Sequence, residues 1–128
     1  LIMRIKKFNE ISSYSEYGNT FDREGAIDEL SKIVISDGEL GVYYNEMVTD
    51  LKRELQSLND DDLKMIIFVN YLNGEIEKGN VKSKDDIPSD FNIEHYKKAV
   101  RLFSKFQEDI TIKYTEKYML DKYPGNIK

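Results

Sequence analysis

The stretch LKMIIFVNYLNGEIE, residues 63–77, decides the fold class, because it fits two different structures. Residues 65–69 form an unbroken apolar run, which suits either a fully buried helix or a buried strand. The helical period continues on both sides of the run, through Leu63, Ile66, Ile67, Leu72 and Ile76. The stretch is therefore predicted to be the most buried helix of the domain.

The ends of this helix are marked by charge and by glycine. Asp60, Asp61 and Asp62 precede the apolar run, and negative charge is favourable in the first turn of a helix, near the positive end of its dipole. Lys78-Gly79-Asn80 is a typical stop, because glycine adopts the backbone conformation that ends many helices. We expect a helix from about residue 60 to about 78.

The rest of the chain predicts three more helices. Apolar spacing places one at about 21–35; a second follows the capping box Ser36-Asp37-Gly38-Glu39 and ends near Leu58; the longest opens at Asp90 or Asn92 and ends near Tyr123. Residues 80–90, rich in charge, are predicted to be an exposed connection.

These helices predict an all-α fold, a bundle of about four helices in a single domain, residues 1–128. Residues 1–19 are expected to form an N-terminal arm or a short element. The alternative is a small α+β domain with strands at 2–8 and 65–69. The predicted core draws on all four helices and consists of Ile27, Leu30, Val34, Tyr44, Met47, Leu51, Leu55, Ile66, Ile67, Val69, Val100, Phe103 and Phe106.

The last helix is longer than a compact domain of this size needs. At 1.5 Å per residue, a helix from residue 92 to 123 would extend for about 45 Å. We expect its C-terminal part to project, to kink or to pair with another chain, and the pairing would make a homodimer.

No catalytic, metal or cofactor site is recognisable. The chain has no cysteine, which excludes disulfides, thiolate nucleophiles and zinc–thiolate sites. His95 is the only histidine, and its place near a helix start suits a surface or capping role. The motifs of calcium and catalytic zinc sites, and the lysine of a phosphate-binding loop, are absent. We expect neither enzyme activity nor a bound cofactor.

Charge is distributed unevenly along the chain. Residues 8–62 contain 14 acidic and four basic residues, a net charge of −10, so the remainder carries +5 of the total of −5. An acidic surface repels nucleic acid and attracts basic partners. Tyrosine is common at protein-binding surfaces because it buries area and keeps a polar tip. The partner-binding candidates are Asp28, Glu39, Tyr43, Glu46, Asp50 and Glu54.

The last helix carries the opposite charge. Lys97, Arg101 and Lys105 are four residues apart and share one side of the helix, with Lys98 beside them. This basic stripe would either dock on the acidic half of the same or another subunit, which we favour, or contact a phosphate backbone.

Several tyrosines lie near these charged residues. Tyr43, Tyr118 and Tyr123 are predicted to be exposed contact residues, while Tyr44 and Tyr114 lie on apolar seams and are expected in the core or at its rim.

The sequence therefore predicts a non-enzymatic protein-binding or regulatory module, of the kind that phages and other mobile elements use to bind a host protein. A nucleic-acid-binding regulator that uses the basic stripe is the alternative. No apolar run approaches the roughly 20 residues of a membrane span, and no signal peptide is recognisable, so we expect no membrane partner and a cytoplasmic location.

Overall fold

A computed structural model describes residues 21–36, 38–123 and 125. Its elements, in chain order, are α2 (Arg23–Ser31), η2 (Gly38–Tyr43), α3 (Tyr44–Gln56), α4 (Asp60–Glu77), η3 (Lys84–Asp86) and α5 (Ile93–Lys122), where η denotes a 3₁₀ helix. The described residues contain no strand, which confirms the all-α bundle of about four helices. The N-terminal arm, residues 1–19, lies outside the described residues, as does the possible strand at 2–8.

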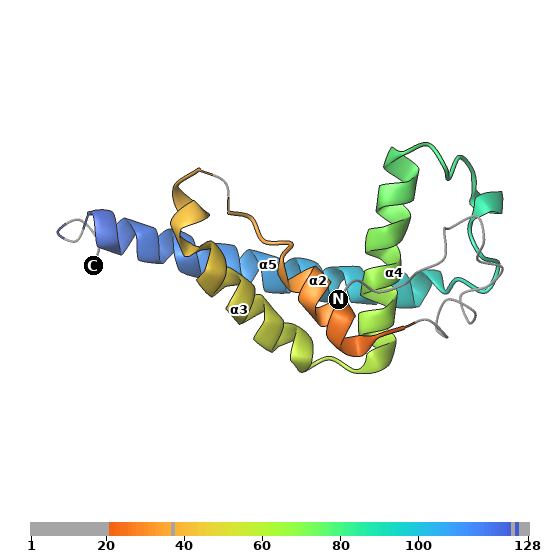
Figure 1. Cartoon of the computed structure of the whole chain (residues 1–128), viewed down its shortest axis with the longest axis horizontal. Coiled ribbons are helices and arrows are strands. Elements are labelled where there is room, and N and C mark those ends of the chain that lie inside the picture. Colours follow the sequence, from red (N-terminus) through yellow and green to blue (C-terminus); the bar gives the residue numbers. More distant parts are fainter. Residues whose placement is uncertain (1–20, 37, 124, 126–128) are drawn as a thin grey trace.

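The helix α5 runs the length of an elongated molecule, and the other elements pack along it (Figure 1). α4 crosses one half of α5 steeply, while α3 and η2 lie along its other half. α2 lies between α3 and α4 and contacts both. Since α5 contacts α4 in one half and α3 and η2 in the other, its long apolar side has to serve two different sets of neighbours.

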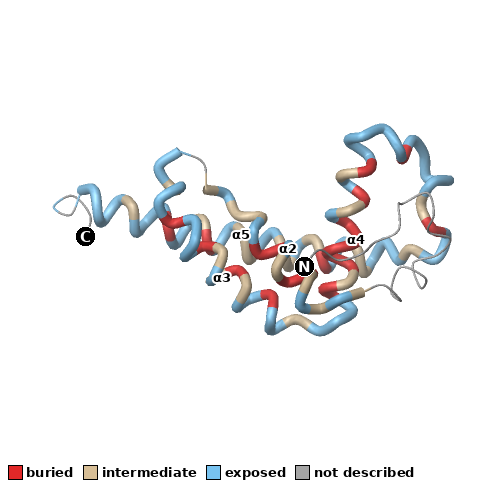
Figure 2. The backbone as a smooth tube through the Cα atoms, in the orientation of Figure 1, coloured by how far each residue is buried: buried red, intermediate tan, exposed pale blue. Residues whose placement is uncertain are grey.

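The run 65–69 is helical and wholly buried, as predicted. Met65 and Phe68 are completely inaccessible, and the other three residues of the run are no more than 7% exposed. The ring of Phe68 lies 5.7 Å from that of Phe91, which in turn lies 5.7 Å from Tyr96 at the start of α5. Figure 2 shows this buried stretch where α4 meets its neighbours. A helix that is apolar on all sides is stable only when it is covered on all sides.

Asparagine side chains cap the two longest helices. The Oδ1 atom of Asn59 accepts a hydrogen bond from the backbone N–H of Asp62 at 2.8 Å, and that of Asn92 accepts one from His95 at 3.0 Å. Each bond satisfies a backbone donor that the first turn of a helix leaves without a partner. Gly79, with a φ of 80°, follows the end of α4. The predicted bounds of these helices are therefore correct to within about two residues.

The first two of the described α-helices are shorter than predicted. α2 ends at Ser31, and the chain beyond it turns towards α5, where Gln107 donates a hydrogen bond to the backbone oxygen of Ile33 at 2.7 Å. Residues 38–43 form a 3₁₀ helix before α3 starts at Tyr44. The apolar spacing assigned both segments to α-helix. The segment after Ser31 instead forms a hydrogen bond with α5, and residues 38–43 form a tighter helix.

The 3₁₀ turn exchanges the expected roles of two tyrosines. Tyr43 is 7% exposed and belongs to the core, whereas Tyr44 is 39% exposed. The predictions that Tyr44 lies in the core and that Tyr43 is an exposed contact residue are both wrong. The reason is geometric: a 3₁₀ helix has three residues per turn, so a face extrapolated with the α-helical period points in the wrong direction.

The rest of the predicted core is confirmed. Eight of its residues are buried, namely Ile27, Leu30, Met47, Leu51, Leu55, Ile66, Ile67 and Val69. Val34, Val100, Phe103 and Phe106 are partly buried and pack against them. The connection 80–90 is mostly exposed, but Val81 and Pro88 are buried and fasten it to the core.

We expect Phe68→Ala to lower the free energy of unfolding by about 3–5 kcal/mol, because it leaves a cavity where α4 is covered on every side. Urea denaturation followed by circular dichroism measures the change. Ile76→Ala on the same helix is the control: Ile76 is 49% exposed, and its loss should cost less than about 1 kcal/mol. Equal losses in the two variants would contradict the placement of the core.

Candidate functional site

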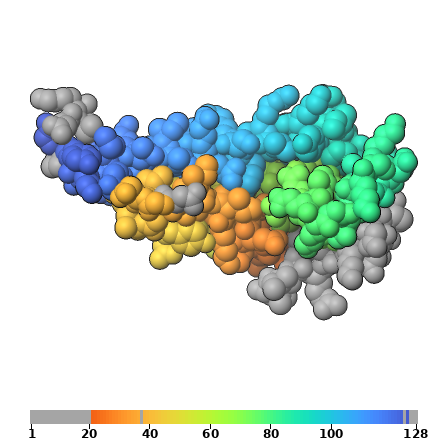
Figure 3. Space-filling model, turned by 90° about the horizontal axis from the view of Figure 1, so that it is seen from above, coloured from red at the N-terminus to blue at the C-terminus, as the bar shows by residue number. Residues whose placement is uncertain are grey.

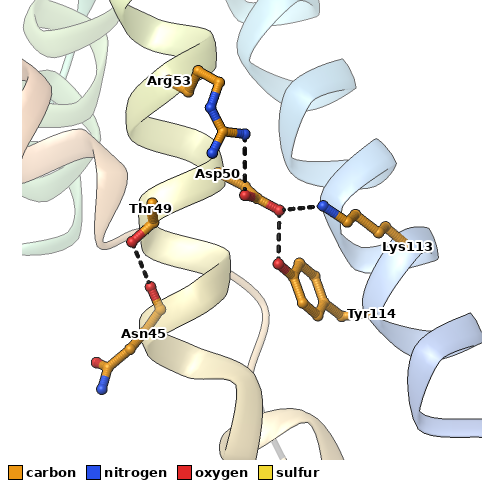
Figure 4. Close-up of polar contacts among 6 residues, drawn as sticks. All are labelled: Asn45, Thr49, Asp50, Arg53, Lys113 and Tyr114. Atoms are coloured by element: carbon orange, nitrogen blue, oxygen red, sulfur yellow. Dashed lines mark hydrogen bonds and ion pairs between the residues drawn. The ribbon is translucent and has the colours of Figure 1, made fainter.

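Asp50 is the centre of a polar cluster that joins α3 to α5 (Figure 4). Its Oδ2 atom accepts hydrogen bonds from Lys113 Nζ at 2.8 Å and from the Tyr114 hydroxyl at 2.7 Å. Its Oδ1 atom accepts one from Arg53 at 3.2 Å. The Asp50 side chain is only 13% exposed. This carboxylate, predicted as part of a partner-binding surface, is therefore engaged within the fold.

The electrostatics of the cluster favour its charged form. Burial alone would raise the pKa of Asp50, but the hydrogen bonds from Lys113 and Tyr114, with the positive charge of Lys113, outweigh it and lower that pKa. The hydrogen bond to Asp50 in turn raises the pKa of Lys113. Both partners hold their charges over a wider pH range than either would alone, as expected of a structural ion pair.

The sequence also predicted Tyr43 and Glu39 as partner-binding residues, and both are engaged by α5. The hydroxyl of Tyr43 donates a hydrogen bond to Asp121 at 2.8 Å, and its ring lies 5.4 Å from that of Tyr114. Burial, together with the hydrogen bond to Asp121, raises the pKa of Tyr43 to about 12. Glu39 accepts a hydrogen bond from the Tyr118 hydroxyl at 3.0 Å. These contacts fasten η2 to the C-terminal half of α5.

Of the three remaining partner-binding candidates, Asp28 is engaged within the fold, whereas the carboxylates of Glu46 and Glu54 are not. Asp28 pairs with Lys32 at 3.2 Å and with Lys52 at 3.7 Å. Glu46 and Glu54 are exposed on α3, and neither carboxylate has a hydrogen bond or ion pair among the described residues. The acidic surface is therefore smaller than the sequence suggested, and a part for these residues in partner binding stays a prediction.

The basic stripe is exposed along its whole length. Lys97 lies 3.7 Å from Glu94 and Lys105 lies 3.3 Å from Asp109, both pairs within α5, while Lys98 and Arg101 have no ion-pair partner in the part of the chain described. The contact that we expected between this stripe and the acidic half is made instead by Lys113. The four basic side chains therefore remain facing solvent.

His95 and Asp62 form a contact that the sequence analysis missed. The Nε2 atom of His95 lies 2.9 Å from Oδ1 of Asp62, and the two side chains are 24% and 9% exposed. The pair joins the first turn of α5 to the first turn of α4. His95 thus connects two helices, in addition to its expected place at a helix start. No spacing rule could find this pair, because its members are 33 residues apart.

Arg23 is a second structural residue that sequence reasoning missed. Its guanidinium donates to the backbone oxygens of Gln56 at 3.0 Å and Leu58 at 2.8 Å, and to the carboxylate of Asp60 at 2.8 Å. Positive charge is favourable at the C-terminal end of a helix, where carbonyl groups lack partners. Arg23 therefore holds the turn between α3 and α4 against α2.

A groove of about 250 Å³ lies between α4 and α5. Apolar side chains form its floor, and uncharged polar groups from both helices form its rim; the lining residues are Ile33, Ile66, Val69, Asn70, Asn73, Val100, Phe103, Ser104 and Gln107. No titratable side chain lines it. The helix spacing that defined the core also predicted the floor, but nothing in the sequence showed that the two helices leave this space open.

The described part of the chain holds no group of three or more histidine, aspartate or glutamate side chains close enough to bind a metal ion. None of its helices is both long enough and apolar enough to cross a membrane. No family model, curated protein or solved structure matches the chain.

We expect Asp50→Asn to lower the free energy of unfolding at pH 7 by about 1.5–3 kcal/mol, the usual worth of hydrogen bonds to a charged group. The pKa of Asp50 is lower in the folded protein than in the unfolded chain, so its stabilising contribution is present above about pH 4 and is lost as the pH falls through the folded value. Urea denaturation of both proteins across this range should show the difference shrinking at low pH.

The control for this variant is Glu54→Gln on the same helix, whose carboxylate is exposed and without a partner among the described residues. Its effect should stay below about 0.5 kcal/mol at every pH. A loss in Asp50→Asn that did not depend on pH would show that the cluster acts through packing and not through charge.

Proposed function

We propose that the protein is a non-enzymatic module that binds another protein, and that the groove between α4 and α5 is its binding site. The composition of the groove carries this proposal: an apolar floor that accepts a large side chain, under a rim of amide and hydroxyl groups. Binding sites for peptides and small ligands commonly combine a mostly apolar surface with a few polar groups that fix orientation.

The amides on the rim suit a peptide backbone. Asn70 and Asn73 are exposed on α4, one turn apart, and a carboxamide both donates and accepts hydrogen bonds, as a peptide group does. An extended segment could place an apolar side chain on the floor while its main chain bonds to the rim. The absence of a titratable group from the lining supports a binding role over a catalytic one.

Charge near the groove favours an acidic partner. Arg101 precedes Ser104 of the rim by one turn of α5, and both residues are exposed. Arg101 has no ion-pair partner among the described residues, so its guanidinium remains available for a carboxylate of the partner. The partner that fits is a segment with a bulky apolar residue next to an aspartate or glutamate. A host protein as the source of that segment, and a cytoplasmic setting, are part of this proposal.

A peptide library displayed on phage tests the proposal without knowledge of the natural partner. We expect selected peptides to combine an apolar anchor with acidic residues, and to shift the backbone amide signals of groove residues in ¹⁵N-edited NMR spectra. Ser104→Trp fills the groove from its exposed rim and should weaken their binding at least about tenfold, because one desolvated anchor carries much of the energy of such contacts.

The matched control is Gln56→Trp, which adds the same side chain at an exposed position at the end of α3. It should leave binding unchanged. Failure to select any peptide, or binding that survives Ser104→Trp, would contradict the groove as the site.

Binding of nucleic acid is the second candidate, and the exposure of all four stripe residues favours it. If it is correct, a gel-shift signal at low salt should disappear when Lys97 and Arg101 are both changed to Glu, because each reversal replaces a phosphate contact by repulsion. Lys82→Glu, on the exposed connection, is the control. An unchanged signal in the double variant, or none in the wild type, would exclude this candidate.

A further inference from the structure

The C-terminal half of α5 has an uncovered apolar side. Ile112 and Met119 are 57% and 37% exposed, and they share one side of the helix because they are seven residues apart. Ile110 and Tyr114, which are buried in the bundle, lie on the opposite side. Figure 3 shows that α5 forms one whole edge of the molecule, with the other helices on the other side of it. No described segment covers these two side chains.

A stripe of five exposed residues contains this apolar pair. The stripe runs Glu108, Ile112, Thr115, Met119, Lys122, and its spacings of four, three, four and three are those of a seam between two helices. It starts with an acid, ends with a base and has its one small hydroxyl in the middle. We call these five residues the α5 seam.

We infer that a second copy of the chain packs on the α5 seam in the antiparallel direction. If the second helix is turned end for end about Thr115, Glu108 faces Lys122 of the second copy, Ile112 faces its Met119, and Thr115 faces its Thr115. The Glu108–Lys122 and Ile112–Met119 contacts then each occur twice by symmetry, and the Thr115–Thr115 contact lies on the twofold axis and occurs once. A parallel pair would instead place Glu108 against Glu108 and Lys122 against Lys122. The order of residues along the seam therefore selects one direction.

The charged ends of the seam, Glu108 and Lys122, are both exposed to solvent. The carboxylate of Glu108 has no hydrogen bond or ion pair within the described part of the chain. Lys122 forms a hydrogen bond with Tyr118 and lies 5.7 Å from the centre of its ring, and an exposed, flexible lysine side chain can exchange these contacts for a carboxylate. The apolar gain comes from Ile112 and Met119, whose exposed surface would be removed from water.

The contact would be small, since one face of about four helical turns meets another. Stable dimers commonly bury 1,200 Å² or more, and smaller interfaces belong to weak or transient pairs. We therefore expect a dimer that forms in the micromolar range or above and dissociates on dilution. This inference goes beyond the proposed function, because the seam and the groove are different surfaces, so either can fail without the other.

The chain has no cysteine of its own, so single cysteines report the register directly. We expect Thr115→Cys to form disulfide-linked dimers on mild oxidation. Glu108→Cys and Lys122→Cys should not form them alone, but a mixture of the two should, because these positions face each other only in the antiparallel pair. Ile76→Cys, at an exposed position of α4, is the control and should stay monomeric. Cross-linking of Glu108→Cys with itself would contradict the direction.

Sedimentation of the unmodified chain tests the contact in solution. The dimer should be weakened about tenfold by Glu108→Lys or by Lys122→Glu, and restored when both changes are combined. Ile112→Glu should abolish it, and circular dichroism should show that each variant keeps its helices. A chain that stays monomeric at millimolar concentration, a dimer that ignores these changes, or a double variant that fails to recover would each overturn the inference.

Discussion

The architecture depends on one constraint, the need to cover residues 65–69 of α4 from every direction. These residues leave no polar side on which this part of the helix could meet water, and a helical segment that is apolar on all sides is stable only inside other elements. α2 packs against it in the first half of the chain and α5 in the second. Arg23 and His95 then add polar links from those two helices to the first turn of α4, through Asp60 and Asp62. The bundle is thus assembled around its most apolar segment.

Local patterns in the sequence were enough to predict the helices. The features that they did not predict depend on contacts between residues far apart in the chain. The start of α5 was recognisable at Asn92 because a cap acts on residues two or three positions away, and the start of α4 because three aspartates favour the first turn of a helix. The groove and the Asp62–His95 pair depend on how α4 and α5 cross, which no local spacing contains. Tyr43 shows the same limit on a smaller scale, because one 3₁₀ turn before α3 shifts the inward direction by a residue.

Several acidic residues of the first half, which were expected to bind a partner, form contacts within the fold instead. A carboxylate that is paired with a cation in the fold adds less to the field that attracts a partner than an unpaired one does. Asp50, Asp28 and Glu39 are instead satisfied within the fold, and Lys113 supplies the positive charge that the basic stripe was expected to supply. The ion pair of Asp50 with Lys113 and the hydrogen bond of Glu39 with Tyr118 therefore hold α3 and η2 to α5. The basic side chains that have no ion-pair partner among the described residues, Lys98 and Arg101, lie in the other half of α5.

The length of α5 follows from the elements that its inward side has to cover. Its inward side covers α4 near Ala99 and then binds α3 and η2 near Tyr114, so its 30 residues are set by the need to reach both ends of the bundle. A helix that spans the molecule along one edge necessarily presents an equally long outer side. On that side basic residues come first, and Ile112 and Met119 follow. Ile112 and Met119 leave 57% and 37% of their surface exposed there, and this is the physical reason to seek their role in contacts with a second copy.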